Sequence, residues 1–426
     1  LDGARSIAWS FASPTEGFAF EQFSAQFNRP DLVRKRLAGE EIPPLPPVLR
    51  PPRLEVAAPS LTSIAADRIA LKATVSSTQR VDRVRVFVNG RPAVDKPVCA
   101  ASASLSLDDV PLQAGRNRVA VVAYDAAGFA SNPQKLDIVS TAPRARRPEL
   151  WVISMGVSRY PRLEPEHQLE YADDDARSIA QTFAGQVGEG KPFAKLLPIT
   201  LFDSEVTVDS VKEAVRILEK MSPDDLAVVF MAGHGVRRRD GKMVFLTSGA
   251  DLTPEGVERH GVGWDVIQGH LGQAKGRVMV LLDACHSGHV STDIIAPNEA
   301  LAASLAAARR AGVLVFAAAR GSQLSYEVPP GGGRLPSGSR GLELAVEGPP
   351  PPLPPTLPGG HGLFTSAVLE AMTGGASDRD RSGAIEVDEF IDHVTWRVRT
   401  MSNGAQTPWM ARREMFGDFV VAPVRR

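Results

Sequence analysis

The chain has 426 residues, which is too many for one compact domain and predicts about two or three. Its formal net charge of -1 excludes a strong overall field that would draw the chain to nucleic acid or to a membrane surface. Cys99 and Cys285 are its two cysteines, so a disulfide framework is excluded, and no apolar run is long enough to span a membrane. Scarce cysteine suits both the cytoplasm and the periplasm, so the compartment stays open.

Residues 1–42 hold several phenylalanines without a clear period, and we expect a tail or the end of an upstream domain there. The chain begins at Leu1 rather than at Met, so we expect it to be a piece of a longer protein. Residues 43–53 are rich in proline and predict a stiff, extended linker.

Residues 54–141 have the pattern of short strands. Apolar and polar residues alternate in VDRVRVFVNG and NRVAVVAYDAAG, and turn signals such as Asn89-Gly90 separate the segments. Strands of this size and spacing predict a small β-sandwich, and the run resembles bacterial immunoglobulin-like domains. We see no chemistry in this region, and we interpret Cys99 as a small buried apolar residue.

Residues 142–149 form a second linker, after which the period changes. From 150 to 424, near-continuous apolar segments such as LWVISMGVS, LAVVFMAGHG and RVMVLLDACHSG alternate with segments of helical spacing. Strands that are apolar on both faces belong to a largely parallel sheet with helices on both sides. The predicted fold class of this region is therefore α/β.

Two of the apolar segments end in reactive side chains. LAVVFMAGHG ends near His234, which glycines flank, and RVMVLLDACHSG ends near Cys285. The carboxyl ends of parallel strands meet at the edge of the sheet where ligands bind. A thiol becomes a strong nucleophile when a nearby imidazole takes its proton. The alternative is that His234 satisfies a loop and Cys285 is a core residue at a strand end.

The motifs AGHG and DACHSG, with the cysteine about 50 residues after the histidine, resemble those of the caspase-like cysteine peptidases of the C14 family. The likeness is strongest to the metacaspase and prokaryotic caspase-homologue branch, and YADDDA, HGLFT and QTPWM support it. It implies the caspase-like (caspase-hemoglobinase) fold, a mostly parallel sheet flanked by helices. It also implies cleavage of protein or peptide substrates without a cofactor for the chemistry.

The resemblance assigns roles residue by residue. His234 is expected to be the base and general acid, and Cys285 the nucleophile. The backbone amides of Gly235 and Cys285 are expected to form the oxyanion hole.

The residue two before the nucleophile lines the primary specificity pocket in this family, and here it is Asp283, as in metacaspases. A second pocket aspartate precedes an alanine on the first helix, and Asp175 in DDDA matches it. A buried carboxylate needs a cationic partner, and a substrate guanidinium supplies paired hydrogen bonds, so Arg or Lys is expected at the cleavage position. Asp173 and Asp174 are interpreted as a solvated first turn that the helix dipole favours.

The sequence departs from the family pattern at two places. Ala232 stands where the family often has serine, which weakens a pocket contact and leaves the dyad intact. A Gly- and Pro-rich insertion, residues 328–360, follows the fifth strand, where the family usually has a short segment bordering the substrate cleft. The insertion fits a lid, a cleavage site at Arg334 or Arg340, or an inert spacer.

Two nearby histidines are alternatives to His234. His286 and His289 are close to the nucleophile in sequence, but a residue adjacent to Cys285 points away from it, so both rank below His234. No second cysteine or acidic cluster completes a zinc site with them.

The stretch DRDRSGAIEVDE, residues 378–389, fits a twelve-residue calcium loop. Its ligand positions hold Asp378, Asp380, Ser382, Ala384 through its carbonyl, Glu386 and Glu389. Two arginines lower the local negative charge, and a single unpaired loop is less stable than a pair. The stretch therefore also fits a loop that keeps this geometry without metal.

The leading hypothesis is a cysteine endopeptidase with a His/Cys dyad that cleaves after Arg or Lys. A catalytically silent caspase-like module that binds or scaffolds within a multidomain protein is the alternative. A third hypothesis is an enzyme of the same fold with another preference at the cleavage position.

Overall fold

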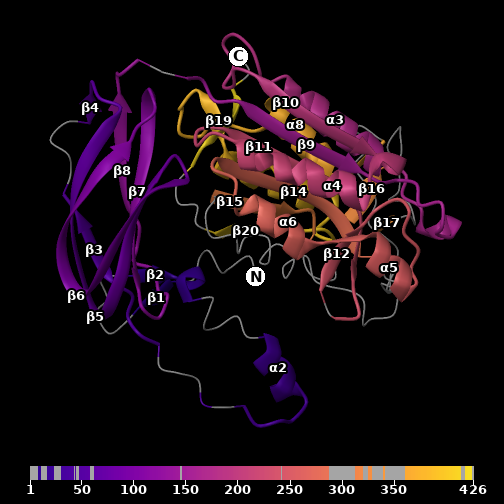
Figure 1. The fold of residues 1–426 in the computed structure, drawn as a ribbon, viewed down its shortest axis with the longest axis horizontal. Helices are drawn as coiled ribbons and strands as arrows, with labels where there is room; N and C mark the ends of the chain where they lie inside the picture. The colour runs from indigo at the N-terminus through magenta and orange to yellow at the C-terminus, as the bar shows by residue number, and fades with distance from the viewer. Residues whose placement is uncertain are drawn as a thin grey trace. The chain divides into compact units, whose positions relative to one another are not determined.

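The structure is a computed structural model, and it describes most of the chain. The described residues are 8–10, 17–23, 30–42, 44, 48–57, 62–143, 146–240, 242–286, 312–319, 325–328, 339–340, 360–413 and 418–424. The chain divides into two compact units, Leu1–Arg144 and Ala145–Arg426, and each is described by itself (Figure 1). Among the described residues, no helix combines the length and the apolar character that a membrane crossing requires.

The first unit is built mainly from strands, as its alternating pattern predicts. β5 lies at the centre: it pairs with β3, β6 and β7, and β7 continues through β8 to β4. Val84 and Val86 of β5 and Val121 of β7 are fully buried in one apolar core, consistent with a β-sandwich. The elements of this unit are β1 (Ala8–Ser10), β2 (Gly17–Ala19), η2 (Phe20–Phe23), α2 (Pro30–Leu37), β3 (Arg53–Val56), β4 (Ser63–Ile64), β5 (Arg68–Val88), β6 (Arg91–Pro111), β7 (Gly115–Asp125) and β8 (Gln134–Ser140).

β5 and β6 form a long hairpin whose turn is Asn89-Gly90. Both turn residues have positive φ, 50° and 81°, the backbone conformation that Asn and Gly adopt most readily. The predicted turn is therefore confirmed. The expectation of a buried thiol at Cys99 is wrong, because Cys99 is exposed. Its φ is +54°, it lies where the β5–β6 pairing shifts register, and its neighbours Val98 and Ala100 are half-buried, so Cys99 takes an exposed place in the alternation.

Two of the early phenylalanines belong to a second, smaller apolar cluster of the first unit. Phe18 and Phe23 are buried, and the ring of Phe23 lies 5.7 Å from that of Phe129, in the loop between β7 and β8. The short elements β2 and η2, which no sequence period predicted, thus bring these phenylalanines into a local aromatic cluster.

The second unit contains an eight-stranded sheet in the order β10-β9-β11-β14-β15-β20, with β12 paired to β11 and β13 paired to β12. The pairs from β10 to β15 are parallel and β20 is antiparallel, so the predicted, largely parallel sheet is confirmed. Every residue of β9 and β15 is buried, which explains their continuous apolar sequence. The strands of this sheet are β9 (Leu150–Gly156), β10 (Leu196–Phe202), β11 (Leu226–Arg237), β12 (Met243–Leu246), β13 (Gly261–Gly263), β14 (Arg277–His286), β15 (Gly312–Ala317) and β20 (Trp409–Arg413).

Helices pack on this sheet in two groups. α3 packs against α8, and α8 against α9, while α4 packs against α6. Their apolar side chains join those of the strands in one continuous core. The helices of this unit are η3 (Pro165–His167), α3 (Ala172–Ala184), η4 (Asp203–Glu205), α4 (Val208–Arg216), η5 (Ile217–Lys220), α5 (Pro254–His260), α6 (Trp264–Leu271), α8 (Leu363–Glu370), the π-helical turn η6 (Ala371–Gly375) and α9 (Val387–Met401).

Short strands lie beside the main sheet. β16 (Ser325–Val328) pairs with β17 (Ser339–Arg340) and with β18 (His361–Gly362), and β19 (Ala384–Glu386) pairs with β21 (Val420–Pro423). Of the predicted insertion at 328–360, residues 329–338 and 341–359 lie outside the described part of the chain. Arg334 is among them, so the three readings of the insertion stay open.

Candidate active site

His234 and Cys285 lie side by side in the backbone. β11 and β14 are neighbouring parallel strands, and their register pairs His234 with Cys285 near the carboxyl ends of both. This is the edge of a parallel sheet where ligands bind. The side chain of Cys285 lies outside what the structure describes, as do the side chain of His286 and all of His289.

The imidazole of His234 is buried and its orientation is held by the loop that follows β9. Its Nε2 lies 2.7 Å from the carbonyl oxygen of His167. A carbonyl oxygen only accepts hydrogen bonds, so Nε2 carries the proton of the neutral ring. In this tautomer Nδ1 is the basic nitrogen.

Tyr160 contacts His234 in two ways. The Tyr160 hydroxyl accepts a hydrogen bond of 2.9 Å from the backbone N–H of His234, and the two ring centroids are 4.8 Å apart. Gly233 makes this approach feasible: its φ is +154°, and a Cβ there would lie 2.9 Å from the Tyr160 hydroxyl. The flanking glycine noted in the sequence therefore serves the residue that supports the base.

Gly235 and Cys285, the predicted oxyanion donors, come from the same strand pair. Gly235 is in register with His286 on β14 and with Phe245 on β12, one step beyond the His234–Cys285 pair. Their backbones are thus adjacent at the strand ends. The backbone N–H of His234 donates to the Tyr160 hydroxyl, so it is not one of the predicted donors to the oxyanion.

Asp283 is fully buried at the end of β14. Its Oδ1 accepts a hydrogen bond of 2.9 Å from Ser325, and its Oδ2 accepts one of 3.0 Å from Thr365. Two hydrogen bonds to a charged acceptor are together worth about 3–6 kcal/mol, the same order as the cost of taking a carboxylate out of water. Ala232 is in register with Asp283 on the neighbouring strand and has no hydroxyl group. The hydroxyl groups that donate to Asp283 therefore come from other elements.

Asp175 is fully buried in the first turn of α3. It accepts a hydrogen bond of 3.2 Å from the backbone N–H of Gly362, and its Oδ1 lies 2.8 Å from Nδ1 of His361. Gly156 allows this turn to lie close to β9, because a Cβ there would overlap the carbonyl oxygen of Ala172. Asp174 is exposed as expected, whereas Asp173 is partly buried and accepts a hydrogen bond from Ser158.

The beginning of α8 brings the two aspartates together. Gly362 is the N-cap of α8 and contacts Asp175, and Thr365 in its first turn contacts Asp283. Both carboxylates therefore lie at the positive end of one helix dipole. The sequence motif HGLFT contained these contacts, but its spacing alone indicated no function for His361 or Thr365.

Two further buried polar residues of this region were missed by the sequence analysis. Glu327 of β16 accepts hydrogen bonds from the backbone N–H groups of Glu170 and Tyr171, just before α3. Gln406 donates to Ala318 and to Ser325, and accepts from the Tyr326 amide. The only signal for Gln406 was its place in QTPWM.

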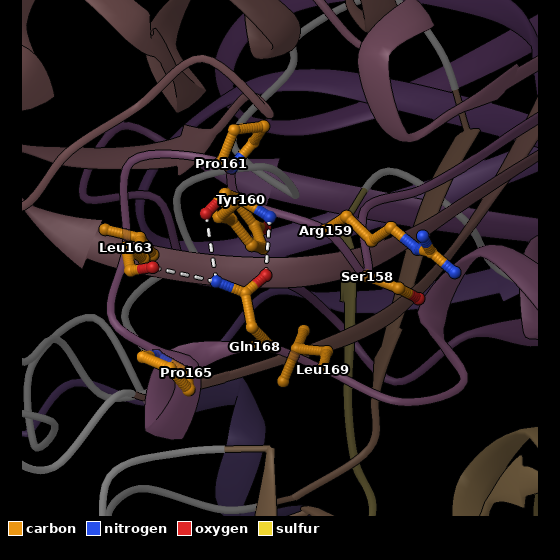
Figure 2. A pocket seen from close by; sticks show the side chains of 8 residues that line it. All are labelled: Ser158, Arg159, Tyr160, Pro161, Leu163, Pro165, Gln168 and Leu169. Carbon is orange, nitrogen blue, oxygen red and sulfur yellow. Dashed lines mark hydrogen bonds between the residues drawn. The ribbon is translucent and has the colours of Figure 1, made fainter.

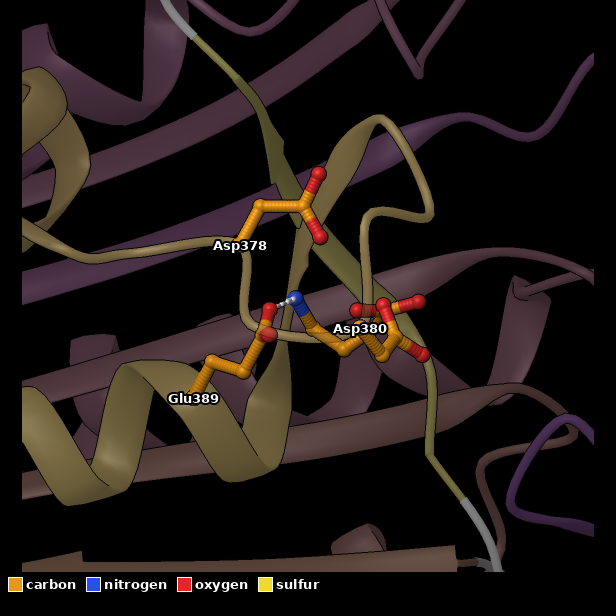
Figure 3. A group of neighbouring side chains, drawn as sticks. Asp378, Asp380 and Glu389 are labelled. Atoms are coloured by element: carbon orange, nitrogen blue, oxygen red, sulfur yellow. Dashed lines mark hydrogen bonds between the residues drawn. The ribbon is translucent and has the colours of Figure 1, made fainter.

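The predicted calcium loop brings its acidic side chains together (Figure 3). One oxygen from each of Asp378, Asp380, Glu386 and Glu389 lies within 4.8 Å of the others. Gly383 has φ +87°, as the turn at its position requires, and the Ser382 hydroxyl contacts the carbonyl oxygen of Ala384.

The same loop makes internal contacts that occupy its last carboxylate. Glu389 accepts hydrogen bonds from the backbone N–H groups of Arg379 and Glu386, and the Arg379 guanidinium pairs with Asp392. The short strand β19, inside the loop, pairs with β21, so the loop has a strand partner that the sequence did not indicate. Within the described residues, these four acids are the one group of His, Cys, Asp and Glu side chains that converges closely enough to hold a metal ion.

The caspase domain of the peptidase C14 family matches residues 151–420. This span is more than half of the chain and includes every residue of the sites described above. The chain belongs to the caspase-domain family. Membership of this peptidase family implies that the substrates of the caspase domain are proteins or peptides.

Solved structures add little to this assignment. The fibronectin(III)-like modules of Clostridium thermocellum CbhA are 20% identical with a TM-score of 0.19, over 23% of this chain and 50% of that chain. The SrpA adhesin R347E mutant of Streptococcus sanguinis is 15% identical with a TM-score of 0.17, over 28% of this chain and 70% of that chain. Scores this low do not establish a shared fold for the unit before the caspase domain. A search of curated proteins finds no match.

Proposed function

We propose that this caspase domain is a cysteine endopeptidase that cleaves peptide bonds after Arg or Lys, with Cys285 as nucleophile and His234 as base. The observation that carries the proposal is the pairing of His234 with Cys285 at the ends of β11 and β14, with Nε2 of His234 held on the His167 carbonyl. That contact leaves Nδ1 as the ring nitrogen with the lone pair for a thiol proton.

The reaction would proceed through an acyl-enzyme. The Cys285 thiol gives its proton to Nδ1 of His234, and the thiolate attacks the carbonyl carbon of the scissile bond. The amides of Gly235 and Cys285 are the proposed donors to the oxyanion. His234 then protonates the leaving amine, the peptide C–N bond breaks, and a water activated by the same imidazole hydrolyses the thioester.

Asp283 and Asp175 are the proposed recognition groups for the basic side chain. Both are buried near the beginning of α8, and hydrogen bonds from neighbouring groups set the orientation of each carboxylate. A guanidinium has a planar set of donors that matches oriented carboxylates, so Arg is expected to be preferred over Lys.

The two cysteines provide a matched test. Turnover of a fluorogenic peptide ending in Arg should be abolished in Cys285→Ala and in His234→Ala. Cys99→Ala is the control, since this thiol is exposed and belongs to the other unit. Full activity in Cys285→Ala would sink the proposed mechanism.

The alternative, a silent binding module, predicts a different result with the same material. A thiol-reactive Arg peptide should label the wild-type chain at Cys285 if the dyad is functional. No labelling at any pH from about 5 to 9, with and without calcium, would favour the silent module.

A different preference at the cleavage position is tested with a panel of peptides ending in Arg, Lys, Asp and Asn. The proposal predicts turnover of the Arg and Lys members alone. Turnover of the Asp or Asn member at a comparable rate would favour the same fold with another specificity.

We also propose that residues 378–389 bind Ca²⁺. The convergence of four carboxylates within 4.8 Å supports this, because Ca²⁺ takes several oxygen ligands. Pairing of β19 with β21 supplies the strand support that a single loop otherwise lacks. The ion would link the loop to the start of α9 and would take no part in bond cleavage.

A further inference from the structure

Two points of attachment hold the proposed base, and both come from the loop between β9 and α3. The Tyr160 hydroxyl accepts from the His234 backbone N–H, and the His167 carbonyl contacts Nε2 of the ring. Tyr160 is completely buried, and its ring lies tilted by 36° against the imidazole. One loop thus fixes both the position of the His234 backbone and the rotation of the His234 ring.

Gln168 ties these two attachments to each other. Its Oε1 accepts from the Tyr160 N–H at 2.7 Å, and its Nε2 donates to the carbonyl oxygens of Tyr160 and Leu163 at 2.9 and 3.0 Å. Figure 2 shows this clamp among the residues that line an open pocket of about 530 Å³. Gln168 directly follows His167, so the same clamp restrains the carbonyl that contacts the imidazole.

The strand end is shaped to receive the phenol. The two nearest groups to a Cβ at Gly233 are the Tyr160 hydroxyl at 2.9 Å and the Phe245 ring at 3.1 Å. Such a contact is shorter than a normal van der Waals separation, so a side chain at this position would displace the Tyr160 ring. The buried Tyr160 ring therefore fits beside the base only because position 233 has no side chain.

We propose that Tyr160, braced by Gln168, is the positioning residue of the His234 base. It acts through His234: its hydroxyl holds the His234 backbone and its ring lies against the imidazole, so that Nδ1 is presented at the strand end where Cys285 lies. The inference rests on the proposed peptidase function. It extends that function by assigning the loop between β9 and α3 a part in catalysis.

The role predicts a specific pattern of kinetic loss. Tyr160→Phe keeps the ring and removes the acceptor of a buried N–H, so kcat for the Arg peptide should fall roughly 10- to 100-fold while KM changes less than about two-fold. Gln168→Met, which keeps the length of the side chain without its hydrogen bonds, should show the same split. Tyr171→Phe is the matched control: its ring is also buried, but its hydroxyl hydrogen-bonds to the Glu170 carboxylate, so kcat should remain within about two-fold.

A second measurement separates positioning from a general loss of structure. Alkylation of Cys285 by iodoacetamide, followed over pH in a Cys99→Ser background, reports the thiolate that His234 stabilises. In the wild-type chain, Cys285 should be alkylated at pH values well below the ordinary thiol pKa of about 8.5. Tyr160→Phe should shift the pH profile of alkylation toward that value. Unchanged thermal unfolding would exclude a folding defect; if the variant unfolds, Gln168→Met supplies the same test.

Failure of the positioning role of Tyr160 can be distinguished from failure of the proposed peptidase function. If the wild-type chain cleaves no peptide, the Nε2–H proton of His234 still reports the arrangement by NMR, with His234→Gln used for assignment. Faster solvent exchange of that proton in Tyr160→Phe supports positioning. Unchanged kcat, alkylation profile and Nε2–H exchange in both variants would overturn it.

Discussion

Two groups of carboxylates lie at the beginnings of two helices in the second unit, and they are arranged differently. Beside α8, Asp175 and Asp283 are fully buried, and each accepts hydrogen bonds from separate neighbouring elements. Before α9, Asp378 and Asp380 are more accessible and converge with the carboxylates of Glu386 and Glu389. Both groups consist of carboxylates, but in one group each carboxylate is held individually and in the other the carboxylates converge on one point.

The difference matters because each arrangement favours a different cation. Carboxylates oriented one by one in a dry site recognise a group with directed donors, such as a guanidinium. Carboxylates that converge near the surface recognise an ion that takes several oxygens in flexible geometry. We therefore expect substitutions in one group to leave the binding partner of the other group unaffected.

The largest effect is expected for Asp283→Asn. Loss of one buried charge that pairs with a substrate cation costs about 3–5 kcal/mol, so kcat/KM for an Arg peptide should fall by roughly 10³-fold. Calcium affinity, measured by isothermal titration calorimetry, should not change. Asp209→Asn, an exposed aspartate on α4, is the control. An unchanged preference for Arg would remove Asp283 from the pocket.

Asp175 and Asp174 form a matched pair of neighbours on α3. Asp175→Asn should lower kcat/KM for the Arg peptide by about 10²-fold, because its carboxylate is fully buried beside the α8 N-cap. Asp174→Asn should change it less than about two-fold, because that side chain is exposed. Equal effects of the two substitutions would contradict a pocket role for Asp175.

Glu389→Gln should lower the affinity of the chain for Ca²⁺ by roughly 10- to 100-fold, since it removes the proposed bidentate ligand. Glu370→Gln is the control, because this glutamate pairs with Arg397 outside the loop. Titration calorimetry measures both. If wild type binds no Ca²⁺ at millimolar concentration, residues 378–389 are a loop that keeps its geometry without metal.

The smallest effect is expected for Thr365→Val, which keeps the shape of the side chain and removes one hydrogen bond to Asp283. A hydrogen bond to a charged group contributes about 1.5–3 kcal/mol, but Ser325 still holds the other oxygen of Asp283 and only the orientation of the carboxylate is weakened, so KM for the Arg peptide should rise only about three- to ten-fold. Thr373→Val, whose hydroxyl contacts only carbonyl oxygens of its own turn among the described contacts, is the control. No change in KM would show that the orientation of Asp283 does not depend on Thr365.

Much of the second unit could be predicted because its strands are apolar on both faces. LAVVFMAGHG and RVMVLLDACHSG can be buried only inside a parallel sheet, and this places His234 and Cys285 near the same edge. Cys99 shows where an expectation from residue type fails: free cysteine is commonly buried, but Cys99 is exposed, at a register shift between β5 and β6.

The sequence by itself determined the fold class, the family resemblance and the residues that carry the proposed chemistry, because apolar periodicity and short motifs are local properties of the chain. Only the tertiary structure decided which groups support them. Tyr160 and His167 meet His234 from more than 60 positions away in the chain, and Gln168 holds Tyr160 in turn. Thr365 and Gly362 reach Asp283 and Asp175 because α8 begins between them. Hydrogen bonds of this kind depend on distances in space that no spacing in the sequence encodes.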